Sequence, residues 1–241
     1  MMSEILTLIQ ERHSARRPFD RHRPVAQQDL RQILEAARWA PTAHNMQNFE
    51  IIVVDDAETI TRIGDITSPI SEVFIRENYQ QLSFSEDELR LKKVGLLATM
   101  FPSSWRVPDA KLDLAALNSE RALGHQTARD TPLLLIVAYD IRKRAPASEG
   151  DVLGVMSLGC VLDNMWLVAQ SLKIGFHVLS ALSTAPTENE VKRILGIPDY
   201  LKIAFTCRIG YPLSAPDRYL RVRREVEDFT HYNQYGNKGL G

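Results

Sequence analysis

The segment 151–173 constrains the fold of this chain more than any other stretch. Asp163 is its only interior charge, and its apolar residues point in every direction around a helix axis. A chain of 241 residues rarely buries such a helix completely by itself. The length, about 20 residues, would also suit a membrane span, but Asn164, Gln170 and the lack of aromatic and basic flanks disfavour that reading. The sequence therefore predicts a central helix, buried on all sides, that two copies of the chain share.

Other stretches predict shorter helices and buried strands. Residues 3–11 and 26–40 have helical apolar spacing, with Ser3 as an N-cap and Pro41 as a stop signal. Thr187 and Glu190 form a capping box that predicts a further helix start. Polar helical patterns cover residues 71–80 and 85–93. Apolar runs predict buried strands at residues 49–54 and 133–137, and residues 175–180 and 202–209 predict a third and a fourth strand. This alternation is typical of α/β or α+β layering.

Composition and motifs exclude several classes of protein. A net charge of -1 gives no general attraction to nucleic acid or to an anionic membrane. Cys160 and Cys207 form no C-x-x-C pair, and the N-terminus lacks a signal-peptide pattern, so we expect a cytoplasmic protein. The six histidines show no i, i+4 pair, so no metal site is predicted. The fingerprints of Rossmann dinucleotide sites, P-loops and the commonest serine hydrolases are also missing.

Two arginine clusters lie near opposite ends of the sequence. Arg12-His13-Ser14-Ala15-Arg16 forms the first, and Arg221-Val222-Arg223-Arg224 forms the second. If the two clusters meet, up to five guanidinium groups converge, and an anion such as phosphate would hold them together. The alternative is that both runs are solvated surface.

The loop between the second predicted helix and the first predicted strand carries two amides. Asn45 and Gln47 are spaced so that both side chains can point the same way from an extended backbone. Such amides can pair with a heterocycle that presents alternating carbonyl and N–H groups. They could equally serve only to cap the loop.

Together these motifs resemble the FMN-dependent nitroreductase family. The resemblance rests on Arg-His-Ser-x-Arg near the N-terminus, the Pro-Thr-Ala-x-Asn-x-Gln loop, and the C-terminal Gly210-Tyr211-Pro212 followed by the second arginine cluster. It implies an α+β fold with a central, mostly antiparallel sheet flanked by helices, in an interlocked homodimer. It also implies one domain over residues 1–241, with an inserted helical or lid region at about 60–127 and a dimer-wrapping tail at about 212–241.

The resemblance also implies a set of cofactor-binding residues. Some would hold the FMN phosphate and ribityl chain, others would line the isoalloxazine ring from the partner subunit, and a turn after the third strand would place an N–H against N5. These residues are Arg12, His13, Ser14, Arg16, Pro41, Thr42, Ala43, Asn45, Gln47, Ser180, Ala181, Leu182, Arg221 and Arg223. Arg16 would give electrostatic support near the N1 and C2 edge of the flavin. No side chain is expected to act as a nucleophile.

The implied activity is a ping-pong oxidoreduction. NADPH or NADH would donate hydride to FMN, and a small planar acceptor of nitroaromatic or quinone type would then be reduced. The alternatives are a specialised flavin enzyme, for example a reductive dehalogenase, and a non-catalytic FMN-binding module. The chain departs from the family pattern at Gln47-Asn48-Phe49, where relatives commonly continue with Pro-Trp, and at His44. Asn118 and Gln126 are weak candidates for flavin contacts from the middle of the chain.

Overall fold

The structure is a computed structural model that describes residues 3–66, 82–100, 127–215 and 220–238. The chain forms two compact units. The first unit contains Met1–Ser68 and Ala122–Pro216, and the second contains Pro69–Arg121 and Asp217–Gly241. The second unit therefore consists of residues from the predicted insertion and the predicted tail. That all 241 residues form one domain stays a prediction.

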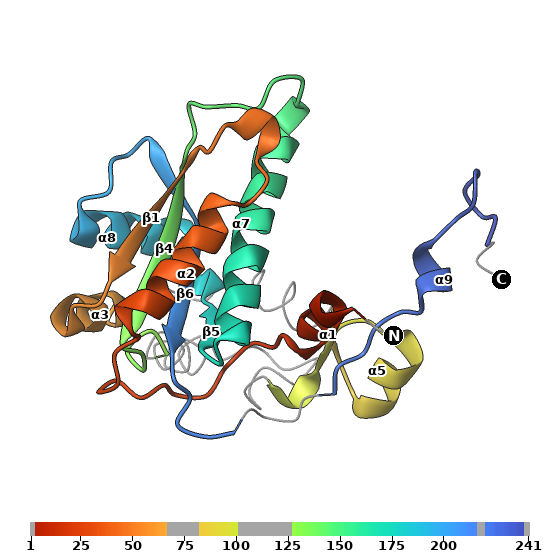
Figure 1. Cartoon of the computed structure of the whole chain (residues 1–241), viewed down its shortest axis with the longest axis horizontal. Helices are drawn as coiled ribbons and strands as arrows, with labels where there is room; N and C mark the ends of the chain where they lie inside the picture. The colour runs from red at the N-terminus through yellow and green to blue at the C-terminus, as the bar shows by residue number, and fades with distance from the viewer. Residues whose placement is uncertain (1–2, 67–81, 101–126, 216–219, 239–241) are drawn as a thin grey trace, which may run out of the picture. The chain divides into compact units, whose positions relative to one another are not determined.

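The first unit is organised around a four-stranded antiparallel sheet (Figure 1). Its order is β1 (Phe49–Val54), β4 (Leu133–Asp140), β6 (Leu201–Gly210) and β5 (Gly175–Val178). β4 pairs with β1 on one side and with β6 on the other, and a bulge at Val137/Ala138 shifts its register with β6. All four predicted strands are present, and the predicted antiparallel sheet is confirmed.

Helices cover both faces of this sheet (Figure 1). On one face α2 (Gln27–Arg38) and α7 (Val152–Ser171) pack against alternate side chains of the central strands, including Leu135, Val137 and Cys207. On the other face α3 (Ala57–Gly64) and α8 (Ala185–Leu195) cover Leu134 and Ile136. Because β4 is covered on both faces, it reads as an unbroken apolar run.

α7 is only partly buried within its own chain. Gly154, Ser157, Leu158, Val161, Met165 and Ala169 are buried against the sheet and α2. Val152, Val155 and Met156 in the N-terminal half are 57, 58 and 61 % exposed, so a single chain does not bury the helix on all sides, and its burial between two copies stays a prediction. Residues Glu149–Ser171 have the length and hydropathy of a membrane span, a property that core helices share.

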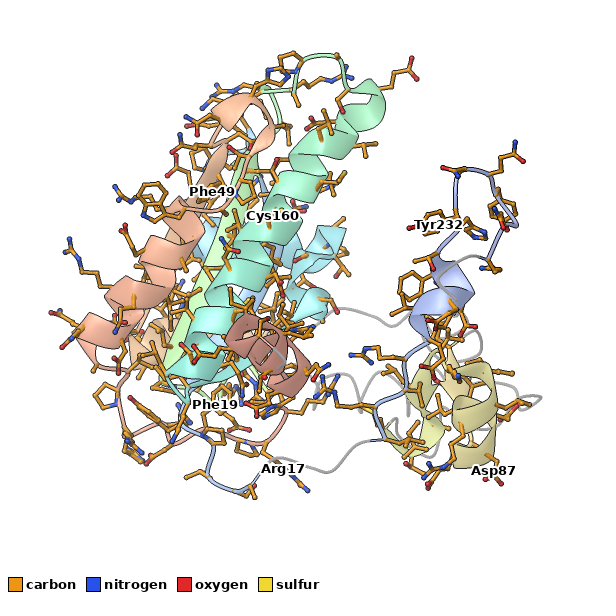
Figure 2. All side chains as sticks on the ribbon, turned by 45° about the vertical axis from the view of Figure 1, so that its right-hand side comes forward. Arg17, Phe19, Phe49, Asp87, Cys160 and Tyr232 are labelled. Atoms are coloured by element: carbon orange, nitrogen blue, oxygen red, sulfur yellow. The ribbon has the colours of Figure 1, made fainter. Side chains whose placement is uncertain are left out.

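The N-terminal segment runs from α1 (Glu4–Glu11) along the free edge of β5. Ser3 caps α1, as predicted, by accepting a hydrogen bond from the Leu6 N–H at 3.2 Å. The Ala15 N–H then donates to Phe176 O at 3.0 Å, and the Phe19 N–H donates to Asp130 O at 3.0 Å. The Phe19 side chain is buried (Figure 2). The segment therefore closes one edge of the sheet.

The boundaries of two predicted elements are wrong. β5 ends at Val178, where a 3-10 turn, η6 (Ser180–Ser183), begins. α8 begins at Ala185 after the N-cap Thr184, so the capping box expected at Thr187 is not formed. Proline fits the first turn of a helix, because the N–H it lacks would have no partner there, and this lets α8 begin before Pro186. Thr187 is instead buried inside the helix.

The described part of the second unit contains short elements. α5 (Glu86–Lys92) is capped by Ser85, whose reciprocal bonds with Glu88 form a capping box. β2 (Ser83–Phe84) and β3 (Leu96–Leu97) form a two-stranded parallel pair. In the tail, Glu225 precedes α9 (Val226–Phe229) and forms an ion pair with Lys93 at 2.9 Å. The helix predicted at residues 71–80 lies outside the described residues.

A substitution in the central strand β4 tests this description of the core. Ile136→Ala should lower the free energy of unfolding by about 2–5 kcal/mol, because Ile136 is fully buried on the α3–α8 face. Ile141→Ala, at a residue that is 52 % exposed just after the same strand, should change it by less than about 0.5 kcal/mol. Urea unfolding followed by circular dichroism measures both, and equal losses would contradict this account of the core.

Candidate functional site

The donor loop, residues 12–16, lies between α1 and the edge of β5. Arg12 is the C-cap residue of α1, and its guanidinium lies over the Trp166 ring at 4.4 Å from the centroid. Arg12 Nε lies 3.6 Å from Asp163 Oδ1, and this buried nitrogen has no hydrogen-bond partner among the described residues. A buried donor that makes no hydrogen bond, although it lies within ion-pair distance of a carboxylate, is suited to a further acceptor that a ligand would supply.

Trp166 of α7 fixes the start of this loop. Its indole Nε1–H donates to His13 O at 3.1 Å, and its ring stacks on Phe176 with 5.4 Å between centroids. The His13 ring lies within 3.1 Å of Glu11 O through Nδ1. Ser14 and Arg16 are partly buried. The donor loop is therefore held on a rigid aromatic pair rather than projecting freely into solvent.

Arg208 of β6 holds the other end of the loop. Its side chain is fully buried, and its Nη2 donates to the carbonyls of Ala15, Arg16 and Arg17 at 3.1, 2.6 and 3.0 Å. Its Nε donates to His177 Nδ1 at 3.0 Å, so His177 is neutral and acts as an acceptor. Burial lowers the pKa of Arg208 to about 10, which leaves it charged at neutral pH.

The loop between α2 and β1 borders a hollow of about 500 Å³. Its lining residues are Arg38, Trp39, Ala40, Pro41, Thr42, Asn45 and Gln47. The structure thus brings four of the five predicted loop residues, Pro41, Thr42, Asn45 and Gln47, to one hollow. The fifth, Ala43, donates its N–H to Ser157 Oγ of α7 at 2.9 Å, which anchors the loop. This hollow is the second candidate half of the site.

The backbone of this loop differs from the extended form that the sequence predicted. Residues 43–45 form a 3-10 turn, and His44, Asn45 and Gln47 have φ values of 52°, 53° and 44°. The Gln47 Nε2–H donates to Asn45 Oδ1 at 2.9 Å, so the two amides pair with each other. Left-handed conformations of non-glycine residues are strained and concentrate at functional sites.

An exposed tryptophan stands at the edge of the same hollow. Trp39 is 71 % exposed, yet its Nε1–H donates to Glu35 Oε1 at 2.8 Å, and Arg38 donates to the same oxygen. The hydrogen bond from Trp39 and then that from Arg38 lower the pKa of the Glu35 carboxyl. The indole is therefore oriented in advance beside the loop amides.

The turn η6 carries the last predicted residues of the first unit. Ser180 is exposed and Ala181 is partly buried, whereas Leu182 is 1 % exposed in the core under α8. The Leu182 N–H already donates to Leu179 O at 3.4 Å. Of the three backbone donors predicted here, Ser180 and Ala181 are thus the better candidates for contact with a ligand.

The loop between α2 and β1, residues 39–48, is called the amide loop after Asn45 and Gln47. One chain does not bring the donor loop and the amide loop together. Ala43 contacts α7 at Ser157, while Arg12 contacts it at Asp163 and Trp166. At 1.5 Å per helical residue, these positions are roughly 9 to 14 Å apart along the axis. Figure 1 shows α1 near one end of α7 and the segment after α2 at the other end.

Arg221 and Arg223 belong to the second unit. Arg221 and Arg223 are exposed residues of the tail, and Arg223 Nη1 donates to Val222 O at 2.7 Å. Their convergence with Arg12 stays a prediction. Asn118 and Gln126 lie outside the described residues. Over the described ranges there is no group of three or more His, Cys, Asp or Glu residues that could hold a metal ion.

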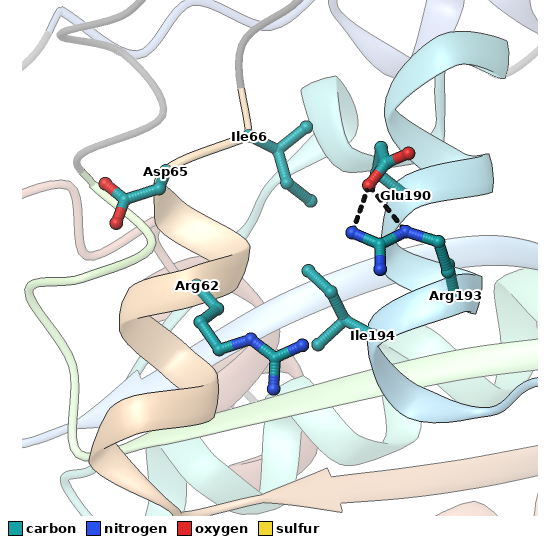
Figure 3. Close-up of a pocket in the computed structure, with 6 residues that line it drawn as sticks. All are labelled: Arg62, Asp65, Ile66, Glu190, Arg193 and Ile194. Atoms are coloured by element: carbon teal, nitrogen blue, oxygen red, sulfur yellow. Dashed lines mark hydrogen bonds and ion pairs between the residues drawn. The ribbon is translucent and has the colours of Figure 1, made fainter.

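A second hollow, of about 410 Å³, lies between α3 and α8 (Figure 3). Arg62, Asp65, Ile66, Glu190, Arg193 and Ile194 line it. Arg193 is bound to Glu190 by two hydrogen bonds of 3.0 and 2.8 Å, so these two charges satisfy each other. None of the predicted site residues lines it, and we assign it no function.

Sequence reasoning did not identify the two residues that hold the donor loop. Arg208 is a charge in the buried, largely apolar part of a strand, and Trp166 is an aromatic residue in an apolar helix. A charge in a buried strand needs hydrogen-bond partners, so its position could have been recognised as unusual. Its partners, Ala15 to Arg17, are about 190 residues away in the sequence and could not have been found from local pattern.

An antiparallel sheet between helices, with the donor loop and its arginines along one edge, defines an α+β protein. The chain belongs to the Nitroreductase family, since residues 9–211 match the family's sequence model. The resemblance to this family that the sequence motifs indicated is confirmed.

Individual relatives are distant. An NADPH-dependent oxidoreductase of Staphylococcus epidermidis is 21 % identical over 234 residues, which cover 97 % of this chain and 75 % of that protein. A nitroreductase from Bacteroides fragilis, solved with bound FMN, has a TM-score of 0.57 at 20 % identity, with 96 % of this chain and 98 % of that chain covered. An oxidized iodotyrosine deiodinase bound to FMN and 3-iodo-L-tyrosine has a TM-score of 0.60 at 21 % identity, covering 96 % and 100 %.

The pairing of His177 with Arg208 predicts a pH dependence. Burial, then the charges of Arg208 and Arg16, lower the pKa of His177 from 6.5 to about 3. The unfolded chain therefore binds a proton at this residue at a higher pH than the folded protein does. The resulting stability is complete above pH 6.5 and is lost as the pH falls toward 3.

His177→Asn keeps an acceptor near the Nδ1 position and removes this titration. Its free energy of unfolding should fall less steeply than that of the wild type as the pH drops below about 6.5. Urea unfolding at several pH values measures the difference. An unchanged slope in His177→Asn would contradict the assignment.

Proposed function

We propose that this chain is an FMN-dependent oxidoreductase that takes hydride from NADPH or NADH and reduces a small planar acceptor of nitroaromatic or quinone type. The observation that carries the proposal is the buried Nε of Arg12, which has no hydrogen-bond partner in the described part of the chain. It lies in a loop whose other donors, Ser14 and Arg16, are partly buried beside it. Guanidinium groups match phosphate oxygens two at a time, so the residues fit a flavin phosphate.

The amide loop would take the other end of the cofactor. Pro41, Thr42 and Ala43 would line the ring, while Asn45 and Gln47, which now pair with each other, would exchange that bond for contacts with the polar edges of the ring. FMN, when bound, supplies the hydride-accepting and hydride-donating chemistry. Arg16 would favour negative charge beside the ring, and the N–H groups of Ser180 and Ala181 would orient it.

A site assembled from both loops requires a second copy of the chain. The exposed residues Val152, Val155 and Met156 form an apolar strip on the N-terminal half of α7. Two α7 helices that pack antiparallel about a two-fold axis would cover this strip. The same arrangement would bring the amide loop of one chain to the donor loop of its partner, because the loops contact opposite ends of α7. We therefore propose a homodimer with two composite sites.

Relatives support this proposal and one alternative. The Staphylococcus relatives are named NADPH-dependent oxidoreductases, and the Bacteroides fragilis structure contains FMN. The iodotyrosine deiodinase makes reductive dehalogenation a second candidate, and a non-catalytic FMN-binding module is the third. Cys160 and Cys207 are free thiols, which suits a reducing cytoplasm.

An anaerobic titration tests the activity. Purified protein should bind about one FMN per chain, and NADPH or NADH should bleach the flavin absorbance. A nitroaromatic or quinone should then restore it, with parallel double-reciprocal plots for a ping-pong reaction. Reoxidation by a halogenated aromatic substrate alone would favour the dehalogenase, and bound flavin that neither nicotinamide reduces would favour the binding module. Failure to bind FMN would overturn all three.

Arg12 should contribute directly to FMN affinity. Arg12→Ala should raise the Kd for FMN by about 10–100-fold, because a charge-assisted hydrogen bond contributes about 1.5–3 kcal/mol. Flavin fluorescence quenching measures the change. Arg31→Ala, an exposed arginine on α2, serves as the control and should bind FMN like the wild type. Equal Kd values for both variants would remove Arg12 from the site.

The apolar strip on α7 should hold the dimer together. Met156→Glu places a charge in the proposed interface, so sedimentation velocity should show a monomer that has lost FMN. Val53→Glu, at a partly exposed position on the edge strand β1, should remain dimeric. A Met156→Glu protein that stays dimeric and keeps its flavin would contradict the proposed interface.

A further inference from the structure

Arg208 is the most deeply buried charged side chain of the described residues, with 0 % exposure. Its six hydrogen bonds end on five backbone carbonyls and one imidazole. Burying a guanidinium is costly unless all its donors are used, and an apolar side chain would serve the core at least as well. Packing of the core alone therefore does not explain why an arginine occupies position 208.

The explanation lies in the backbone that Arg208 gathers. Nη2 contacts three consecutive carbonyls, those of Ala15, Arg16 and Arg17, while Nη1 contacts Thr127 O and Asp130 O at 3.4 Å. Because these three carbonyls all accept from the same nitrogen, they restrict the backbone conformation from Ala15 to Arg17. Together with the Ala15 N–H bond to Phe176 O, they fix the backbone on both sides of Arg16.

Arg208 thus supports the backbone of the donor loop, whose side chains would contact the ligand. Arg12 is fixed from the α7 side by Trp166 and Asp163, and the backbone at Arg16 is fixed by Arg208. Several like charges near one another repel, so a loose loop would splay its arginines apart. When the loop is already ordered, the free energy needed to bring its arginines together is not paid at the binding step.

We propose that Arg208 is a positioning residue that orders the donor loop before FMN binds, so that Arg12 and Ser14 meet the phosphate, and Arg16 meets the flavin ring, without rearrangement. The inference rests on the proposed function for the identity of the anion. The ordering of the loop in the ligand-free protein is independent of it. Lysine at this position would keep the charge but could not reach carbonyls on both sides through a planar fork.

Three variants separate this role from simple stability. Arg208→Met removes all donors at similar volume, Arg208→Lys keeps the charge, and Ile136→Ala lowers the stability of the neighbouring strand without touching the loop. Hydrogen–deuterium exchange of the FMN-free proteins follows peptides that cover residues 13–19 and 133–140. The Kd for FMN is measured on the same proteins, together with the rate of flavin reduction per bound FMN.

In Arg208→Met, the amides of residues 13–19 should exchange at least about tenfold faster while residues 133–140 stay protected, as expected for local opening. The Kd for FMN should rise at least about tenfold, equivalent to 1.4 kcal/mol. Arg208→Lys should give intermediate values in both measurements and keeps the test valid if Arg208→Met fails to fold. The rate of flavin reduction per bound FMN should fall by a smaller factor than the Kd rises, because Arg208 does not touch the reacting atoms and acts on the ring only through the placement of Arg16.

Two results would overturn the inference. The first is wild-type exchange at residues 13–19 in Arg208→Lys, whatever the flavin result. The second is an increase in the Kd of Ile136→Ala as large as in the Arg208 variants at matched melting temperature, since the effect would then follow stability alone. A wild-type protein that binds no FMN would instead overturn the proposed function, and the exchange data would still decide whether Arg208 orders the loop.

Discussion

The structure depends on one buried arginine that ties the two ends of the first unit together. Arg208, near the end of the last strand, donates to the carbonyls of Ala15 to Arg17, which precede it by about 190 residues. Because a buried guanidinium must use its donors, this network fixes where the N-terminal segment crosses the sheet edge. The placement of Arg12 and Arg16 beside β5 follows from it, and so does the neutral state of His177.

α7 provides the second constraint, because it separates the two halves of the proposed site. Trp166 and Asp163 hold the donor loop, while Ser157 holds the amide loop roughly two turns earlier. The exposed apolar side chains Val155 and Met156 lie on the N-terminal half of the same helix. α7 is apolar all round but is covered on one side only within its chain. A second chain packed on the exposed side would cover it and would complete the proposed site.

The fold was largely predictable, and the errors were local. Largely apolar stretches correctly indicated all four strands of the sheet, and β4 and β6 are covered on both faces. The start of α8 was wrong because Pro186 tolerates a helical first turn and Thr184 lies in the N-cap position ahead of it. Asn45 and Gln47 were expected on an extended backbone, but a 3-10 turn and left-handed φ values direct their amides to each other.

The sequence by itself determined the family through the motifs that resemble it, and it determined the strand positions and the dense arginine cluster, which depend on local composition and periodicity. Only the tertiary structure decided how that cluster is held. The partners of Arg12 and of the Ala15–Arg17 backbone are Trp166 and Arg208, which come from a helix and a strand more than 150 residues away. Local pattern carries no information about such pairs, because a buried donor selects its acceptor by where the packed sheet places it.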